Sequence, residues 1–392
     1  MHATAPGDDI LSMTTDRTAA RKGTRTAPAL LAALALTAGL AVAAPAPALA
    51  AQATPGWSRP APAPHVDAVP AHGPVVGTPG AVSTARSTAH RVFGRPRSGK
   101  PWHSGFWAGG VASAGRIAAA GTWRGSPMDV ATTYGNYGTW AEIAGSEWNI
   151  TTFAGFPGRL AYGLPLLPRN RAGHWEDILS GANDAAFATV ARQLVKAGRG
   201  TSAVRVGWEA NGTWYPWAVT ARTAPKFRAA VRRVVAVMKA QAPHLTFWLD
   251  LAAGTALPGQ TSRLDPLTRL YPGDGVLHGV SMDHYDQWNT RARTRGGFTR
   301  STRPAVAAGL ADAATFARVH RIGFAVPEWG LNRVHGSGDN PLFVERMFAF
   351  FTANRDVLVF ESYFNEADPY IANALWGAPQ NPRSAAVYRR LW

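Results

Sequence analysis

The feature that most restricts the fold of this chain is an alternation of short apolar stretches and helical patterns that begins near residue 102. Eight stretches have the length and apolar content of buried strands: 103–110, 127–135, 159–168, 202–210, 245–253, 277–286, 322–330 and 357–365. Apolar runs of this kind, bounded by helices, are typical of parallel strands that are covered on both faces. Eight strands alternating with helices over roughly 290 residues predict an α/β protein with a (β/α)8 TIM barrel.

Helical patterns separate these stretches and are clearest at 184–198, 222–241, 304–320 and 340–354. Pro304 is suited to the first turn of a helix, and Asn340 followed by Pro341 has the form of a cap and a first-turn proline. An open doubly wound sheet is the alternative fold. The glycines of FWAGGVASAGR (106–116) do not follow the G-x-G-x-x-G order typical of that fold, so the barrel is the better interpretation.

The first 50 residues have the layout of a secretory signal peptide. A basic stretch at 17–25 precedes an apolar run at 27–44, and a small-x-small site follows at 48–50. A transmembrane anchor is the alternative, but the run is rich in alanine and shorter than the ~20 residues that span a bilayer. We therefore expect cleavage and secretion, with no stable membrane insertion. Residues 51–100 are rich in Pro, Ala, Gly, Ser and Thr, which predicts a disordered linker before a barrel domain at 101–392.

The composition narrows the chemistry. The chain contains no cysteine, which excludes a thiol nucleophile, a disulfide and a cysteine metal site. With 40 Lys+Arg against 24 Asp+Glu, its formal net charge is +16. Such a surplus can bind an anionic polymer, either of the cell wall or a nucleic acid. Because no dense Lys/Arg run and no nucleic-acid motif is present, we interpret the surplus as compositional. We expect a monomer with no nucleic-acid partner.

Carboxylates and aromatic rings gather at the expected carboxyl ends of the strands, where TIM barrels place their functional groups. The acids are Glu209, Asp250, Asp283, Asp286, Glu328 and Glu361, and Trp107 and Tyr134 are among the rings. Sugar rings stack their apolar C–H faces on indoles and phenols, and a pair of carboxylates performs glycosidic cleavage. The ends of the fourth and seventh strands, Glu209 and Glu328, are the predicted catalytic pair, with carboxyl groups about 5–6 Å apart.

Two segments carry a resemblance to a known family. RVGWEANGTWYPW (205–217) resembles the acid/base segment of glycoside hydrolase family 26, a mannanase-rich family of retaining barrels, and FAVPEWG (324–330) resembles its nucleophile strand. The resemblance implies a secreted retaining endo-β-glycosidase acting on a polysaccharide, with Glu209 as acid/base, Glu328 as nucleophile and Tyr285 beside the nucleophile. The family usually has His immediately before the acid/base Glu, where this chain has Trp208. The implied substrate is therefore β-mannan or a related β-glucan or xylan.

Other side chains are predicted to contact the carbohydrate: Arg205, Trp208, Asn211, Trp214, Trp217, Tyr285, Trp288 and Trp329. Arg205 has the strand parity of Glu209, so we expect it to enter the barrel and influence the charge of that acid. The alternatives are that the tryptophans belong to the core and that Asn211 is only a turn residue. Asp250 and Glu361 are the rival catalytic carboxylates.

Asp283, His284 and Asp286 are a further group of polar side chains, but they match no metal-binding motif. Adjacent strand residues point to opposite faces, so we expect neither a metal nor a cofactor. Two alternative functions remain at the level of sequence. One is a non-catalytic barrel that binds polysaccharide or cell wall through its aromatic rings, and the other is a metal-dependent barrel hydrolase.

Overall fold

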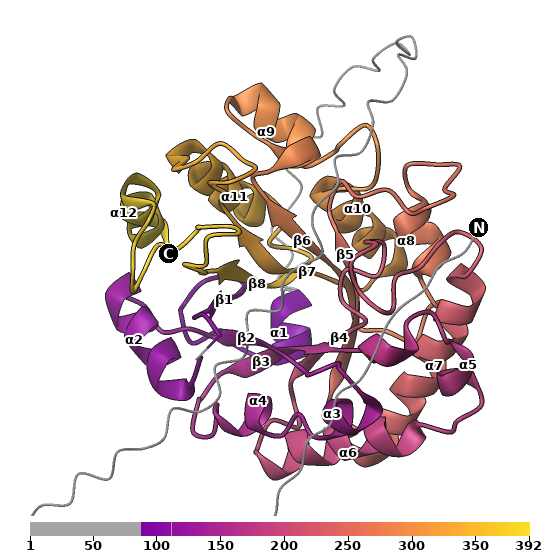
Figure 1. The fold of residues 1–392 in the computed structure, drawn as a ribbon. Coiled ribbons are helices and arrows are strands. Elements are labelled where there is room, and N and C mark those ends of the chain that lie inside the picture. Colours follow the sequence, from indigo (N-terminus) through magenta and orange to yellow (C-terminus); the bar gives the residue numbers. More distant parts are fainter. Residues whose placement is uncertain (1–87, 111) are drawn as a thin grey trace, which may run out of the picture. The chain divides into compact units, whose positions relative to one another are not determined.

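The computed structural model describes residues 88–110 and 112–392, and these contain a closed barrel of eight parallel strands in sequential order (Figure 1). The strands are β1 (His103–Trp107), β2 (Val130–Tyr134), β3 (Arg159–Leu164), β4 (Ala203–Val206), β5 (Thr246–Ala252), β6 (Gly279–Tyr285), β7 (Gly323–Gly330) and β8 (Leu358–Phe364). Each lies inside its predicted stretch, so the TIM-barrel prediction is confirmed and the open-sheet alternative is wrong.

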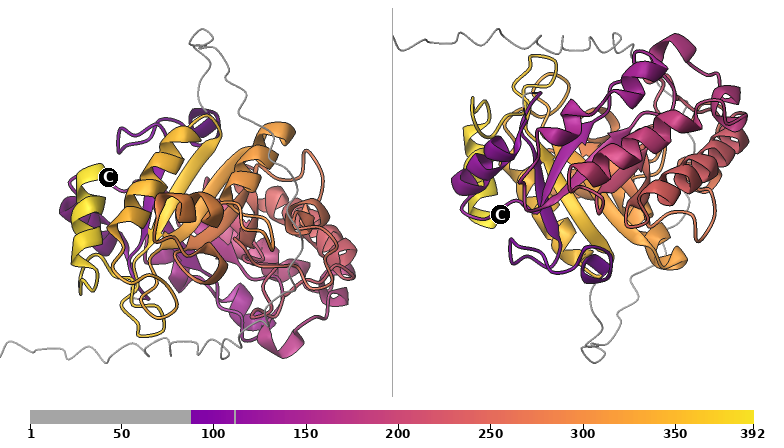
Figure 2. Two further views of the ribbon diagram at one scale, coloured as in Figure 1. Left: turned by 90° about the horizontal axis from the view of Figure 1, so that it is seen from above. Right: turned by 90° about the horizontal axis from the view of Figure 1, so that it is seen from below.

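Helices surround the strands, as the two further views in Figure 2 show. They are α1 (Thr88–Phe93), α2 (Ala114–Arg124), α3 (Trp140–Ala144), α4 (Trp148–Thr151), α5 (Glu176–Leu179), α6 (Asp184–Lys196), α7 (Ala224–Gln241), α8 (Asp265–Leu270), α9 (Arg295–Ser301), α10 (Leu310–His320), α11 (Pro341–Ala353) and α12 (Pro382–Leu391), with short 3₁₀ turns η1 (Arg169–Arg171) and η2 (Trp288–Thr290). The last helix, α12, lies beside α2 (Figure 1). Among the described residues, no helix combines the length and the apolar character that crossing a membrane requires.

Two predicted helix starts have different outcomes. The start of α11 is confirmed, because the Asn340 side chain accepts a hydrogen bond from the Phe343 backbone N–H and Pro341 occupies the first turn. The start at Pro304 is wrong, because α10 begins only at Leu310. The Asp312 carboxylate accepts a hydrogen bond from the Gly309 N–H, and this side chain-to-backbone cap fixes the start six residues after the proline.

Helix α1 lies inside the segment for which the sequence predicts a disordered linker. Its Phe93 packs against Trp248 and Phe360, with ring centroids 6.3 and 5.7 Å apart, in an apolar cluster at the amino end of the barrel. At its other end, the Thr88 hydroxyl donates to the Asp356 carbonyl. The part of the predicted linker that the structure describes, from Thr88 onward, therefore contains a helix that packs on the barrel. The predicted signal peptide and the rest of the predicted linker lie outside the described residues.

The barrel interior changes character from one end to the other. At the amino end it is filled by the apolar cluster that includes Phe93 and Trp248, whereas at the carboxyl end buried polar side chains from β4 to β7 point inward. The pairing of β6 with β7 shifts register between Ser281 and His284, and that of β7 with β8 shifts between Val326 and Trp329. Such irregularities re-aim side chains, and these two flank the inward-facing Asp283 and Glu328.

Candidate active site

Arg205 of β4 is the centre of a charged cluster inside the carboxyl end of the barrel. It is fully buried, and its guanidinium donates to Asp250 at 2.9 Å, to Glu328 at 2.7 Å and to Asp283. The three carboxylates come from β5, β7 and β6, so one cation gathers acids from three neighbouring strands. Burial of a carboxylate is unfavourable without such a partner. The expectation that Arg205 enters the barrel is confirmed.

The cluster holds an excess of potential negative charge, because three acids share one guanidinium. Burial, together with the charges of Asp250 and Glu328, raises the pKa of Asp283 well above its ordinary value despite the attraction of Arg205. One oxygen of Asp283, Oδ1, has no hydrogen-bond partner in the described part of the chain. Asp283 is therefore the member of the cluster that most readily keeps a proton.

Glu328 is the member held in its ionised form. Its Oε2 accepts a hydrogen bond of 2.8 Å from the Tyr285 hydroxyl, and its Oε1 accepts the bond from Arg205. Burial by itself would raise the pKa of Glu328. The Arg205 charge and hydrogen bonds from Tyr134, Tyr285 and Arg205 outweigh it and leave the pKa below the ordinary value. Tyr285 thus lies beside Glu328, where the family resemblance placed it.

Glu209 follows the end of β4 in a turn with an unusual backbone. Its φ is 52°, in the left-handed region that a glutamate rarely adopts, and Gly207 two residues earlier has φ 60°. Such strain persists only where surrounding contacts impose it. Here the Glu209 N–H donates to Asp250 Oδ1 at 3.2 Å, and Glu209 Oε2 accepts from the Trp214 indole at 2.8 Å. These contacts hold the half-buried carboxyl group in a fixed orientation.

The pKa of Glu209 moves in the opposite direction from that of Glu328. Burial is the largest cause, and the negative charges of Glu328 and Asp250 add to it, so that the pKa of Glu209 rises to about 8. The hydrogen bond from Trp214 opposes this rise. At neutral pH the site therefore contains one protonated and one ionised glutamate, which is the arrangement needed by a general acid and a nucleophile.

Aromatic rings line the rim near Glu328. Trp107 stacks on Phe364 with centroids 5.6 Å apart and meets Tyr134 edge-on at 5.2 Å, and Tyr285 packs edge-on against Phe364. The indole N–H of Trp107 donates to Glu366, in the loop after β8. The predicted contact residues do not include Trp107, Tyr134 or Glu366. Trp107 and Tyr134 are the last residues of β1 and β2. Their position at strand ends is the signal that could have added them to the predicted contacts.

Four of the predicted sugar contacts are buried and pack against other parts of the protein. Trp208 is 2% exposed and packs in a ring cluster with Tyr215 and Trp217, whose indole N–H donates to the Trp208 carbonyl. Asn211 is also buried, and its side chain ties the turn to the backbone of Ala252 and Thr255. These three residues hold the turn that carries Glu209 against the protein.

The fourth is Trp329, which is fully buried on the outer face of β7. Its indole N–H donates to Glu361, which also accepts from Trp392. Because Glu328 points into the barrel, its neighbour must point outward. Glu361 shares that outer environment, so of the two rival carboxylates only Asp250 belongs to the site.

The remaining predicted contacts occupy the rim. Trp214 is half-buried beside Glu209, and Trp288, on η2, is 40% exposed. His284 faces outward and stacks on Phe343, whereas Asp286 accepts hydrogen bonds from Asn340. Within the described residues, no three His, Cys, Asp or Glu side chains are arranged to hold a metal ion.

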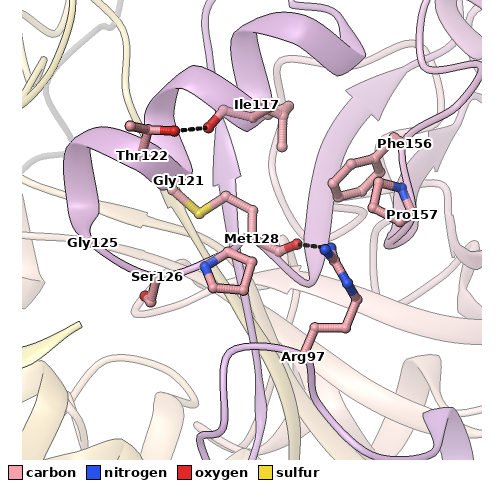
Figure 3. A pocket seen from close by; sticks show the side chains of 11 residues that line it. Arg97, Ile117, Gly121, Thr122, Gly125, Ser126, Met128, Phe156 and Pro157 are labelled. Carbon is pink, nitrogen blue, oxygen red and sulfur yellow. Dashed lines mark hydrogen bonds between the residues drawn. The ribbon is translucent and has the colours of Figure 1, made fainter.

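A pocket of about 420 Å³ lies at the opposite end of the barrel (Figure 3). It is formed at the amino ends of β2 and β3 by residues such as Ile117, Met128 and Phe156. Its one charged side chain, Arg97, donates to the Met128 carbonyl, as Figure 3 shows. No acidic residue lines this pocket.

Solved structures share this architecture. The catalytic domain of a family 26 endo-β-1,4-mannanase from Bacillus sp. JAMB-750 aligns with a TM-score of 0.52 at 15% identity, over 78% of this chain and 90% of that chain. The fold is that of the family 26 glycoside hydrolases. An endo-β-1,4-mannanase from Cellulomonas fimi gives a TM-score of 0.56 at 13% identity, over 78% of this chain and 75% of its own.

The family 26 β-mannanase of Bacteroides ovatus aligns with the same barrel at 12% identity and a TM-score of 0.51, over 77% of this chain and 89% of its own. No protein-family model and no curated protein matches the sequence. At these identities the alignments with family 26 structures establish the fold. The chemistry has to be argued from the side chains.

Proposed function

We propose that the protein is a retaining glycoside hydrolase that cleaves a β-linked polysaccharide, either β-mannan or a related β-glucan or xylan. The observation that carries the proposal is the pair Glu209 and Glu328, which influence each other's ionisation at the carboxyl end of the barrel and whose pKa values move apart. A retaining enzyme requires one acid to be protonated and the other ionised, about 5–5.5 Å apart. The fold shared with endo-β-mannanases supports the same class of reaction.

In this mechanism, Glu328 attacks the anomeric carbon while Glu209 protonates the departing glycosidic oxygen. The C–O bond to the leaving sugar breaks, and an ester between Glu328 and the glycone forms. Arg205 and Tyr285 orient Glu328 by donating to its two oxygens. Forming the ester removes the negative charge of Glu328 that raises the pKa of Glu209. Glu209 can then accept a proton from the water that hydrolyses the ester.

The contact with Trp214 favours one position for the proton of Glu209. An indole N–H is only a donor, and in a neutral carboxyl group the carbonyl oxygen is a stronger acceptor than the hydroxyl oxygen. The proton is therefore favoured on Oε1. Trp214 is a positioning residue that turns Oε1 toward the glycosidic oxygen.

The decisive experiment measures reducing ends released from mannan, mixed-linkage glucan and xylan by the unmodified protein and by Glu328→Gln. Hydrolysis of one polymer that the substitution abolishes supports the proposal, and a 2-fluoro glycoside should trap a covalent ester on Glu328. Polysaccharide binding without release of reducing ends would identify a non-catalytic binding barrel. Loss of turnover on adding a chelator would instead indicate a metal-dependent hydrolase.

We further propose that the protein is exported with removal of the first 50 residues and acts as an extracellular monomer. The basic stretch, apolar run and small-x-small site of the sequence support this proposal. Amino-terminal sequencing of protein recovered from the culture medium tests it. A retained leader on a cell-associated protein would contradict it.

A further inference from the structure

The loop that follows β6 concentrates arginine at the carboxyl end of the barrel. Between residues 287 and 303 it contains Arg291, Arg293, Arg295, Arg300 and Arg303, and no Asp or Glu. All five side chains are exposed. In a TIM barrel, a loop that follows a strand lies on the same face as the active site. A long segment of one charge therefore borders the face that carries Glu209 and Glu328.

Most of these arginines form no ion pair with a carboxylate among residues 88–110 and 112–392. Arg303 lies 3.4 Å from Asp312, and Arg291 donates to the His335 carbonyl. Arg293, Arg295 and Arg300 form no ion pair with a carboxylate in the described part of the chain. The nearest preceding acid, Asp286, is buried and already accepts from the Asn340 side chain and the Ala292 backbone N–H.

An exposed indole precedes these arginines in the same loop, and the turn that carries it, η2, contacts α9. Trp288 is 40% exposed and stacks on His335, with centroids 4.4 Å apart and an angle of 21° between the planes. Its φ of 43° is strained for a bulky residue and must be imposed by its surroundings. The loop after β7 does this, because Gln287 bridges to Gly336 and accepts from Asn332.

The distance from this indole to the reaction centre is short on the scale of a polysaccharide. Trp288 is three residues from Tyr285, so their Cα atoms are no more than about 11 Å apart. Tyr285 itself contacts Glu328. A chain bound across Glu328 can therefore place another of its sugars on Trp288. The arginines come soon after Trp288 in the chain. They can therefore contact substituents of a sugar that is bound on this indole.

We propose that Trp288 and the arginines at 293, 295 and 300 form a subsite for an acidic sugar, so that the substrate is a β-linked polysaccharide that carries uronic acid. This inference rests on the proposed hydrolase function and names the class of its substrate. The indole accommodates the C–H face of the sugar, and guanidinium groups bind its carboxylate through paired N–H donors. The loop after β8 carries Glu366 and Asp368, which disfavour an acidic sugar there and restrict it to the β6 side.

The test compares polymers that differ only in carboxylate content. A partly carboxyl-reduced β-1,4-mannuronan is compared with its fully reduced form, which is β-1,4-mannan, and glucuronoxylan with its carboxyl-reduced form extends the test to a xylan backbone. The variant R293Q/R295Q/R300Q removes three charges from the loop. The matched control R192Q/R232Q/R355Q removes three exposed charges from α6, α7 and the turn before β8.

We expect the unmodified protein to have a lower KM for the acidic polymer than for its reduced form, and this difference should shrink as salt is added. The loop variant should raise KM for the acidic polymer about tenfold with little change in kcat, whereas the control variant should leave the ratio of the two KM values unchanged. Equal KM values for the two polymers, or equal effects of the two triple variants, would overturn the inference.

Binding measured without turnover separates this inference from the proposed function. Migration of Glu328→Gln in gels that contain the acidic or the reduced polymer reports the preference even if no polymer is cleaved. Retardation by the acidic polymer alone, lost in the loop variant, supports the subsite whether or not hydrolysis occurs. Retardation by DNA but not by the uronic acid polymers would instead assign the arginines to nucleic acid and overturn it.

Discussion

Arg205 donates a hydrogen bond of 2.7 Å to Glu328 while the same guanidinium contacts Asp250 and Asp283. One residue thereby keeps the candidate nucleophile ionised and holds together acids from three strands. Its removal should affect catalysis and folding at the same time, and the two effects can be measured separately.

Arg205→Met should lower kcat by at least about 100-fold, because the nucleophile loses both its orientation and the charge that favours its ionised form. The pKa of Glu328 should rise, which moves the acidic limb of the pH–rate profile to higher pH. The variant should also lose about 3–5 kcal/mol of unfolding free energy, because three buried carboxylates lose their cation. Arg233→Met, which removes a partly exposed pairing with Asp184, is the control and should change the unfolding free energy far less. An unmoved acidic limb in Arg205→Met would contradict the role assigned to the guanidinium.

The pH dependence of kcat/KM should be bell-shaped. Activity requires ionised Glu328, whose pKa lies below the ordinary value, so the acidic limb falls only at low pH. Activity also requires protonated Glu209, so the rate should decline as pH rises through about 8. Glu209→Gln should retain some activity on an aryl glycoside with a good leaving group. The pH profile of this residual activity should lack the alkaline limb. A persistent limb near pH 8 in that variant would assign it to another residue.

Trp214→Phe removes the indole N–H that contacts Glu209 and opposes the rise of its pKa. The alkaline limb should move to higher pH. The rate should fall roughly tenfold for natural sugar leaving groups, which need protonation, and little for a dinitrophenyl glycoside, which does not. Trp148→Phe changes an exposed indole on α4 and is the control. It should change neither the pH of the alkaline limb nor the rates on the two substrates. Equal losses on the two substrates would indicate a general structural effect.

Trp208→His restores the residue that the family usually has before its acid/base glutamate. Because Trp208 is packed against Tyr215 and Trp217, we expect a loss of about 3 kcal/mol in unfolding free energy, measured by chemical denaturation. Trp148→His, at an exposed site, should cost far less. A change of polysaccharide preference with unaltered stability would mean that Trp208 reaches the substrate after all.

The sequence predicted the strands well because parallel barrel strands are buried on both faces and therefore form continuous apolar runs. It singled out Glu209 and Glu328, which the structure places at the carboxyl end of the barrel, because strand ends and a family-like motif point to the same residues. It did not show that Trp208, Trp217 and Trp329 are buried, since an aromatic residue near a strand end can pack against the protein or face a sugar. The decision depends on neighbours from distant parts of the chain, which a local pattern does not contain.

The same limit applies to the acids. Asp283 of β6 and Glu361 of β8 are both buried strand carboxylates, yet one contacts Arg205 and the other contacts Trp329 and Trp392 on the outer face. The pairings of β6 with β7 and of β7 with β8 shift register in this part of the barrel. A register shift leaves no pattern of apolar residues in the sequence. The face of the sheet to which each strand carboxylate points could therefore not be predicted from the sequence.

The packing of Phe93 onto Trp248 and Phe360 changes where this protein can be shortened. A chain cut at residue 101, just before the first strand, would keep all eight strands but leave these two rings facing water. We expect such a chain to aggregate on purification, and one that begins before Thr88 to stay in solution. The smallest independently folding piece is thus larger than the barrel itself.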